Sequence, residues 1–143
     1  MILSEVMTRQ LQTISPDATV QEAAEKMRSF DIGILPVSEN HKLVGTLTDR
    51  DIAIRAVARG RDPWKTKTRE IMTTEVVTCY EDQPVEDAAR LMEKNHLHRL
   101  LVVTREDEPV GIFSIGDLAV QSGNDCLTGE VVRFVAEPYR HKR

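Results

Sequence analysis

The stretches GTLTDRD (45–51) and GIFSIGD (111–117) follow one pattern: a glycine, a hydroxyl residue three positions on, and an aspartate three positions after that. A hydroxyl and an acid at this spacing, where a strand enters a helix, are typical of a capping box, in which each side chain accepts from the other residue's backbone N–H. For a single copy, this structural interpretation ranks first.

A ligand site fits the same spacing. The start of a helix offers free N–H groups that suit a phosphate. The hydroxyl can donate to a phosphate oxygen, and the carboxylate can accept from two vicinal hydroxyls such as those of ribose. The glycine would let a ligand approach the backbone. The two interpretations are compatible.

The pattern occurs twice because the chain is duplicated. EVMTRQLQTISPDATVQEAAEKMRSFDI, from Glu5, aligns with EIMTTEVVTCYEDQPVEDAARLMEKNHL, from Glu70, at an offset of 65. One extra residue in the second copy changes the offset to 66, which aligns Thr48 with Ser114 and Asp51 with Asp117. A repeat that covers most of a chain is the first feature to consider in assigning a fold.

Each copy predicts the order β-α-β-β-α. The fold class is therefore α/β (α+β), with two pseudo-symmetric units of about 60 residues packed sheet to sheet, because one such unit alone makes a marginal core. Thr19 is the expected N-cap of the first long helix. The expected boundaries are 1–62 and 63–124 for the repeats, then a 125–143 tail with a short helix ending before Pro138 and a basic end. The expected strands are 11–16, 32–37, 42–48, 76–81, 99–103 and 109–115, and the expected helices are 18–30, 49–60, 84–95 and 116–123.

Composition narrows the class of protein. The 143 residues have a formal net charge of −4, whereas a nucleic-acid-binding protein is typically positively charged. No signal peptide or membrane span is apparent, and Cys79 and Cys126 lack zinc-ligand spacing, so a cytoplasmic location is expected. No nucleophile–base arrangement or metal cluster is apparent either, so the chain is not expected to be an enzyme.

The paired units resemble tandem CBS domains (cystathionine-β-synthase-type repeats), together called a Bateman module. The resemblance rests on VMT…TISPDATVQEAAEKM…ILPV…LVGTLTDRDI and IMT…VVTCYEDQPVEDAARLM…HRLLVV…PVGIFSIGDL, and it covers essentially the whole chain. It implies a sensor that binds an adenosine-containing ligand in clefts between the repeats. AMP, ADP or ATP are expected first, and S-adenosylmethionine or NAD are alternatives.

The resemblance also implies two sets of site residues. In the first cleft, Thr48 would contact phosphate or ribose, Asp51 the ribose hydroxyls, and flanking residues the adenine and phosphates. In the second cleft, Ser114 and Asp117 would hold the ribose. The remaining members are Val76, Val77, His98 and Arg99 for the first cleft, and Leu11, Thr13 and Ile14 for the second.

Other interpretations stay open. The alternatives are a structural module without a tight ligand and a nucleic-acid-binding variant that uses the basic connector around Trp64. His96 and His98 are a weak candidate metal pair, because a third ligand is not evident. The resemblance also implies a homodimer that transmits ligand status to a regulated protein. Its contact would use an apolar stripe on the helices that follow the two motifs: Ile52, Ile54, Val57, Ala58, Leu118 and Val120.

Overall fold

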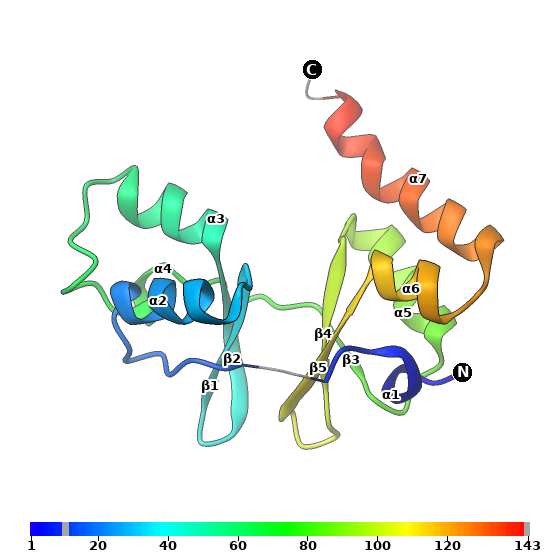
Figure 1. The fold of residues 1–143 in the computed structure, drawn as a ribbon, viewed down its shortest axis with the longest axis horizontal. Coiled ribbons are helices and arrows are strands. Elements are labelled where there is room, and N and C mark those ends of the chain that lie inside the picture. Colours follow the sequence, from blue (N-terminus) through cyan, green and yellow to red (C-terminus); the bar gives the residue numbers. More distant parts are fainter. Residues whose placement is uncertain (10–11, 142–143) are drawn as a thin grey trace. The chain divides into compact units, whose positions relative to one another are not determined.

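The computed structural model describes residues 1–9 and 12–141, which form two compact units (Figure 1). Unit 1 comprises Met1–Gln10, Val77–Glu106 and Val110–Arg143, and unit 2 comprises Leu11–Val76 and Asp107–Pro109. Each unit combines helices with a small sheet, which confirms the predicted mixed α and β fold class.

Unit 2 is built around a hairpin. Strand β1 (Ile34–Glu39) pairs antiparallel with β2 (Lys42–Thr48), and Leu35, Val37 and Leu47 are buried. Helix α2 (Val20–Phe30) has the predicted N-cap Thr19, which forms a capping box with Glu22. The other elements are α3 (Asp49–Asp51), the π-helix η1 (Ile52–Val57) and α4 (Thr68–Ile71).

Unit 1 has the corresponding elements and two more. Its sheet has the order β3-β4-β5, formed by β3 (Thr78–Tyr80), β4 (Arg99–Val103) and β5 (Pro109–Ser114). The helices are α1 (Leu3–Val6), α5 (Val85–Asn95), α6 (Ile115–Gln121) and α7 (Asp125–His141). None of the helices within the described residues has both the length and the apolar character needed to span a membrane.

The strand predicted over 11–16 does not form within the described part of that range. Ile14 makes only an isolated parallel bridge to Val37, although its side chain is buried. The corresponding segment of unit 1 is a three-residue strand that pairs in parallel with β4. The Ile14 N–H donates to the Pro36 carbonyl at 3.0 Å, but Pro36 has no N–H with which to continue the ladder, whereas Leu101, its equivalent in β4, has one.

Each short N-terminal helix packs on the opposite copy of the repeat. The segment that ends in Met7 and Thr8 pairs with β5 through Thr8 and Ile112, and its equivalent pairs with β2 through Thr73 and Thr46. Each compact unit therefore combines the first residues of one repeat with the remainder of the other repeat.

The two motif glycines make this docking close. A Cβ on Gly45 would lie 2.7 Å from the Thr73 carbonyl oxygen, and one on Gly111 would lie 2.6 Å from the Met7 sulfur. We expected these glycines to admit a ligand, and that expectation was wrong: the neighbour that needs the space is the chain itself.

Helix α7 continues through Pro138 to His141, so the expectation that it ends before Pro138 was wrong. Proline has no backbone N–H and cannot donate to the carbonyl four residues earlier, which here belongs to Phe134. The Nδ1 of His96 lies 2.8 Å from that Phe134 oxygen. Because a carbonyl only accepts, this ring nitrogen carries the proton and replaces the missing donor.

Candidate functional site

The Thr48 motif (Thr48–Asp51) lies where β2 enters α3. The Asp51 backbone N–H donates to Thr48 Oγ1 at 3.1 Å, and the Thr48 N–H donates to Asp51 Oδ2 at 3.0 Å. The Asp51 side chain is 15% exposed. The capping box predicted from the spacing is therefore confirmed, and it fixes both side chains in a partly buried position.

The Ser114 motif (Ser114–Asp117) reproduces this geometry in unit 1. The Asp117 N–H donates to Ser114 Oγ at 3.0 Å, and the Ser114 N–H donates to Asp117 Oδ2 at 2.9 Å. In both motifs the hydroxyl keeps its own proton to donate, and Oδ1 is not used by the cap. A capping box therefore leaves a donor and an acceptor that a ligand can use.

A third hydrogen bond connects each motif to the residue that precedes the neighbouring strand, β1 or β4. The Asp49 N–H donates to the Gly33 carbonyl, and the Ile115 N–H donates to the His98 carbonyl, both at 3.0 Å. A Cβ on Gly33 would lie 2.8 Å from Asp49 Oδ2, so the Asp49 carboxylate lies directly over this glycine. The two motifs thus share a backbone frame and differ in the side chains around it.

The predicted site residues are divided between the units. Unit 2 holds the Thr48 motif with Val76 and with Thr13 and Ile14, and unit 1 holds the Ser114 motif with Val77, His98 and Arg99. Leu11 lies outside the described residues. Each predicted set draws on both units, and the pairing of residues into two clefts stays a prediction.

The predicted site residues differ in how exposed their side chains are. His98 and Arg99 are exposed where β4 begins, Val76 and Val77 are partly buried, and Ile14 is buried. Thr13 is partly buried, and its carbonyl accepts from Lys26 Nζ at 2.6 Å.

Three polar residues at the motifs were not predicted as site residues. Arg55 Nη1 donates to the Ile71 carbonyl at 3.0 Å and to Thr73 Oγ1 at 3.2 Å, while Arg55 Nε lies 3.8 Å from Asp51 Oδ1. In unit 1, Thr8 Oγ1 donates to Asp117 Oδ1 at 3.4 Å. The alignment of Thr8 with Thr73 in the repeat could have indicated a shared role. Neither threonine is close in sequence to the aspartate of its motif, so the sequence did not indicate the contact.

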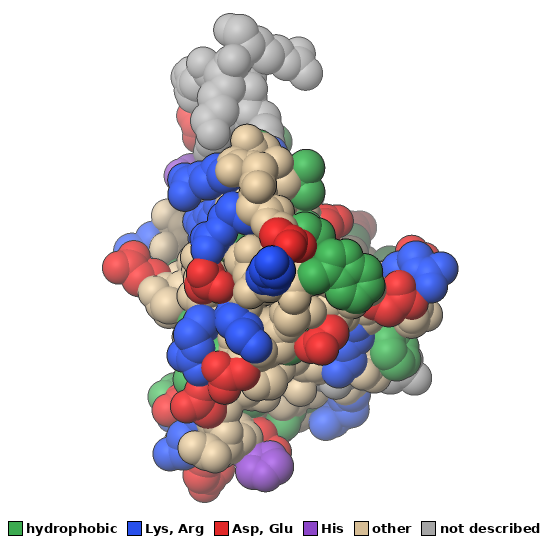
Figure 2. Space-filling view, turned by 90° about the vertical axis from the view of Figure 1, so that its left-hand side faces the viewer, with side chains coloured by type: hydrophobic (Ala, Val, Ile, Leu, Met, Phe, Trp, Pro, Cys, Tyr) green, Lys and Arg blue, Asp and Glu red, His purple; other side chains and the backbone are tan. Residues whose placement is uncertain are grey.

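The basic connector is a mixed-charge surface. Arg61 pairs with Glu70 at 2.5 Å, and Arg69 pairs with Asp17 at 2.8 Å and Glu39 at 3.4 Å. Figure 2 shows Lys and Arg side chains interleaved with Asp and Glu side chains on this side of unit 2. Acidic partners reduce the positive potential available to a nucleic acid.

The two cysteines have different surroundings. Cys79 is buried in unit 1, where burial, assisted by the charge of Asp87, raises the pKa of its thiol from 9.0 to about 11. Cys126 is an exposed free thiol. A raised pKa keeps Cys79 protonated and unreactive near neutral pH.

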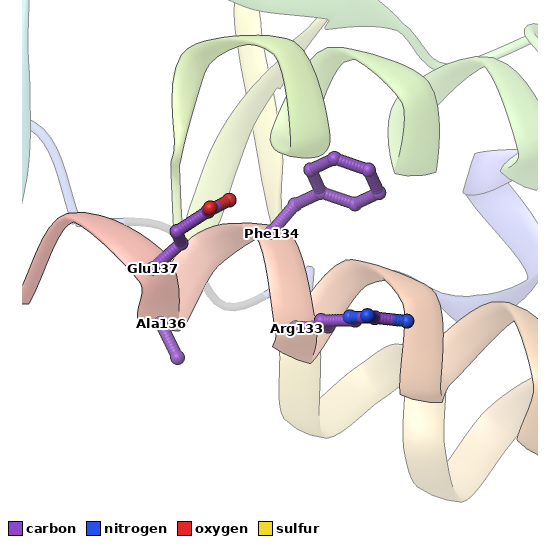
Figure 3. Close-up of a pocket in the computed structure, with 4 residues that line it drawn as sticks. All are labelled: Arg133, Phe134, Ala136 and Glu137. Carbon is purple, nitrogen blue, oxygen red and sulfur yellow. The ribbon is translucent and has the colours of Figure 1, made fainter. Parts of the chain in front are cut away.

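A hollow of about 340 Å³ lies along α7 and is lined by Arg133, Phe134, Ala136 and Glu137 (Figure 3). It contains no residue of either motif. Figure 3 shows the Phe134 ring pointing toward the green helix α5, so this hollow belongs to the packing of α7.

Comparison with known proteins identifies the family. The family model for the CBS domain matches residues 3–57 and again residues 69–121. The chain therefore belongs to the CBS-domain family and contains a tandem pair. It is 39% identical over 139 residues to the CBS domain-containing protein YhcV of Bacillus subtilis, covering 97% of this chain and 98% of the relative.

Two solved structures show what similar chains bind. The CBS domain pair of protein MJ0100, in complex with 5-methylthioadenosine and S-adenosyl-L-methionine, has a TM-score of 0.73 and 31% identity, covering 86% of this chain and 96% of that one. Hypoxic Response Protein I, with two coordinated zinc ions, has a TM-score of 0.75 and 28% identity, covering 85% and 98%. Within the residues described for the present chain, no three His, Cys, Asp or Glu side chains form a group able to hold a metal ion.

Proposed function

We propose that this CBS-domain pair is a regulatory module, without catalytic activity, that binds an adenosine-containing ligand of the AMP, ADP or ATP class. The observation that supports this most is the geometry of the Thr48 motif. Its capping box holds a carboxylate in place while Asp51 Oδ1 stays outside the cap. The MJ0100 domain pair, which binds two adenosine derivatives, makes an adenosine ligand the natural class.

In this proposal the ribose hydroxyls donate to Asp51 Oδ1, and the Thr48 hydroxyl donates to an acceptor on the ligand. Hydrogen bonds to an ionised carboxylate are stronger than neutral ones, so Asp51 provides most of the sugar recognition. Arg99, which is exposed at the start of β4, provides a charge for phosphate groups. The ligand then changes the affinity for a regulated protein only to the extent that it favours one conformation.

We also propose that the module acts as a homodimer. On η1, Ile54 is 50% exposed and Val57 is 69% exposed, and Val120 at the end of α6 is 79% exposed. Leu118 was expected on the same apolar stripe, and that expectation was wrong because Leu118 is fully buried in unit 1. Exposed apolar side chains on corresponding helices suit a self-complementary contact.

The experiment that identifies the ligand is a thermal-shift panel on the purified protein. Its members are AMP, ADP, ATP, S-adenosylmethionine, NADH and, as a contrast, cyclic dinucleotides, with GMP as the matched base control. A ligand that binds only the folded state raises the unfolding midpoint with its concentration. We expect AMP, ADP or ATP to do so and GMP to have a smaller effect. No shift with any adenosine-containing compound would contradict the proposal.

A further inference from the structure

The two motifs have different third partners. In unit 1, the Thr8 hydroxyl donates directly to Asp117 Oδ1 at 3.4 Å. In unit 2, the equivalent hydroxyl on Thr73 instead accepts from Arg55 Nη1 at 3.2 Å. Within the described residues, no hydrogen bond reaches Asp51 Oδ1, which forms an ion pair with Arg55 Nε at 3.8 Å.

The duplication makes this a matched comparison. Thr8 and Thr73 occupy equivalent positions, as do Asp117 and Asp51. The residue that aligns with Arg55 in the second copy is Gln121, at the end of α6. The two copies therefore share the aspartate and the threonine. Only the first copy has an arginine that contacts both residues.

Arg55 is well anchored in its position. Its Nη1 is shared by two acceptors, the Ile71 carbonyl at 3.0 Å and Thr73 Oγ1. It lies on η1, where the Ala58 N–H donates five residues back to Ala53, whereas α6 is an ordinary α-helix. A π-helical turn adds a residue to each turn and redirects the side chains it carries.

We propose that Arg55 is a positioning residue that keeps Asp51 Oδ1 open for a ligand hydroxyl, which makes the Thr48 motif the tighter nucleoside site. This inference rests on the proposed function. Arg55 donates to the Thr73 hydroxyl, and within the described residues no hydrogen bond joins Thr73 to Asp51, whereas Thr8 donates to Asp117. At the Ser114 motif, a ligand hydroxyl must share Asp117 Oδ1 with the long hydrogen bond from Thr8.

The charge of Arg55 acts in the same direction. A cation 3.8 Å from Asp51 offsets part of the carboxylate charge, which reduces repulsion between that carboxylate and an anionic ligand. Gln121 has no charge to offer Asp117. The Thr48 motif therefore suits a phosphorylated nucleoside with a free vicinal diol, and the Ser114 motif suits an uncharged one.

The test titrates AMP and adenosine calorimetrically into variants that exchange the two environments. An Asp117→Ala background reports the Thr48 motif alone, and an Asp51→Ala background reports the Ser114 motif alone. In the first background, Arg55→Gln should weaken AMP binding by about tenfold, the scale of one competing hydrogen bond. Adding Thr73→Val should restore most of that affinity, because it removes the competing hydroxyl.

The double variant separates positioning from direct contact. If Arg55 touched the ligand itself, Arg55→Gln with Thr73→Val would bind as weakly as Arg55→Gln alone, and the inference would be overturned. Thr8→Val, in the Asp51→Ala background, tests the same idea from unit 1 and should tighten adenosine binding severalfold. If circular dichroism shows that Arg55→Gln does not fold, the Thr8→Val variant provides the test. Unchanged adenosine affinity in Thr8→Val would refute the inference.

The outcomes also distinguish this inference from the function on which it depends. A wild-type protein that binds neither AMP nor adenosine contradicts both. A wild-type protein that binds AMP, with unchanged affinity in Arg55→Gln, contradicts only the role of Arg55.

Discussion

At the scale of single residues, two glycines set how closely the leading segments approach the strands. Gly45 and Gly111 are both buried, and a side chain on either would meet the segment that pairs with its strand. The Thr73 carbonyl beside Gly45 is backbone, and it also accepts from the Thr46 N–H at 2.9 Å. It cannot move without loosening that bond.

Gly45→Ala should therefore destabilise the protein by about 1–3 kcal/mol, the usual cost of overpacking. The matched control is Gly129→Ala, since nothing lies within 4 Å of a Cβ at this exposed position in α7. That change should stabilise the protein by about 0.5–1 kcal/mol, because alanine favours the helix. Urea unfolding measures both, and equal effects of the two changes would show that the contact at Gly45 is unimportant.

Much of the candidate site was predictable at this scale, and the limit is physical. The capping boxes follow from a three-residue spacing, so Thr48 with Asp51 and Ser114 with Asp117 were found directly. Arg55 and Thr73 are 18 residues apart, and their contact exists only because α4 leads Thr73 back to β2. No local pattern indicates such a contact.

At the scale of elements, periodicity located the long helices and both hairpins, but it misplaced the end of α7. The rule that proline ends a helix assumes that the freed carbonyl has no other donor. Here His96, just after α5, lies 2.8 Å from the Phe134 oxygen. His96 has a left-handed backbone, with φ of 54°, which turns the chain at the end of α5.

His96→Ala should therefore loosen α7 beyond Phe134 and leave its earlier turns in place. Leu127, Val131 and Val135 stay buried in the unit 1 core and hold that part of the helix. Hydrogen exchange should show faster exchange confined to the last turns. The control is His98→Ala, and a uniform loss of protection along α7 would contradict the proposed role of His96.

At the scale of the whole molecule, the duplication predicted two similar units, and the structure contains them. The sequence alone did not reveal that each leading segment pairs with the other copy, because a repeat fixes only the order of elements and not their partners. The duplication also places a helix with exposed apolar residues after each motif, which is the basis of the proposed dimer.

Val57→Asp should weaken that dimer, because a charge in an apolar contact is costly to desolvate. Val44→Asp is the control, as Val44 is an exposed valine on β2 and not on η1. Light scattering should give twice the chain mass for the wild type and the control, and a lower mass for Val57→Asp. A wild-type protein that is monomeric at high concentration would rule the dimer out.

Calorimetric titration of AMP into the wild type, Asp51→Ala, Arg99→Ala and Asp117→Ala distinguishes an Asp51 that binds ribose from one that only caps a helix. If Asp51 were only a cap, Asp51→Ala would cost about 1 kcal/mol of stability and leave binding intact. If Asp51 holds the ribose, we expect saturable binding to the wild type, loss of the tight site in Asp51→Ala while circular dichroism shows a folded protein, and retention of that site in Asp117→Ala. Arg99→Ala should weaken AMP much more than adenosine, since it removes only a charge-assisted contact to phosphate. Unchanged AMP affinity in both Asp51→Ala and Arg99→Ala would contradict the account and leave helix capping as the whole explanation of the repeated motif.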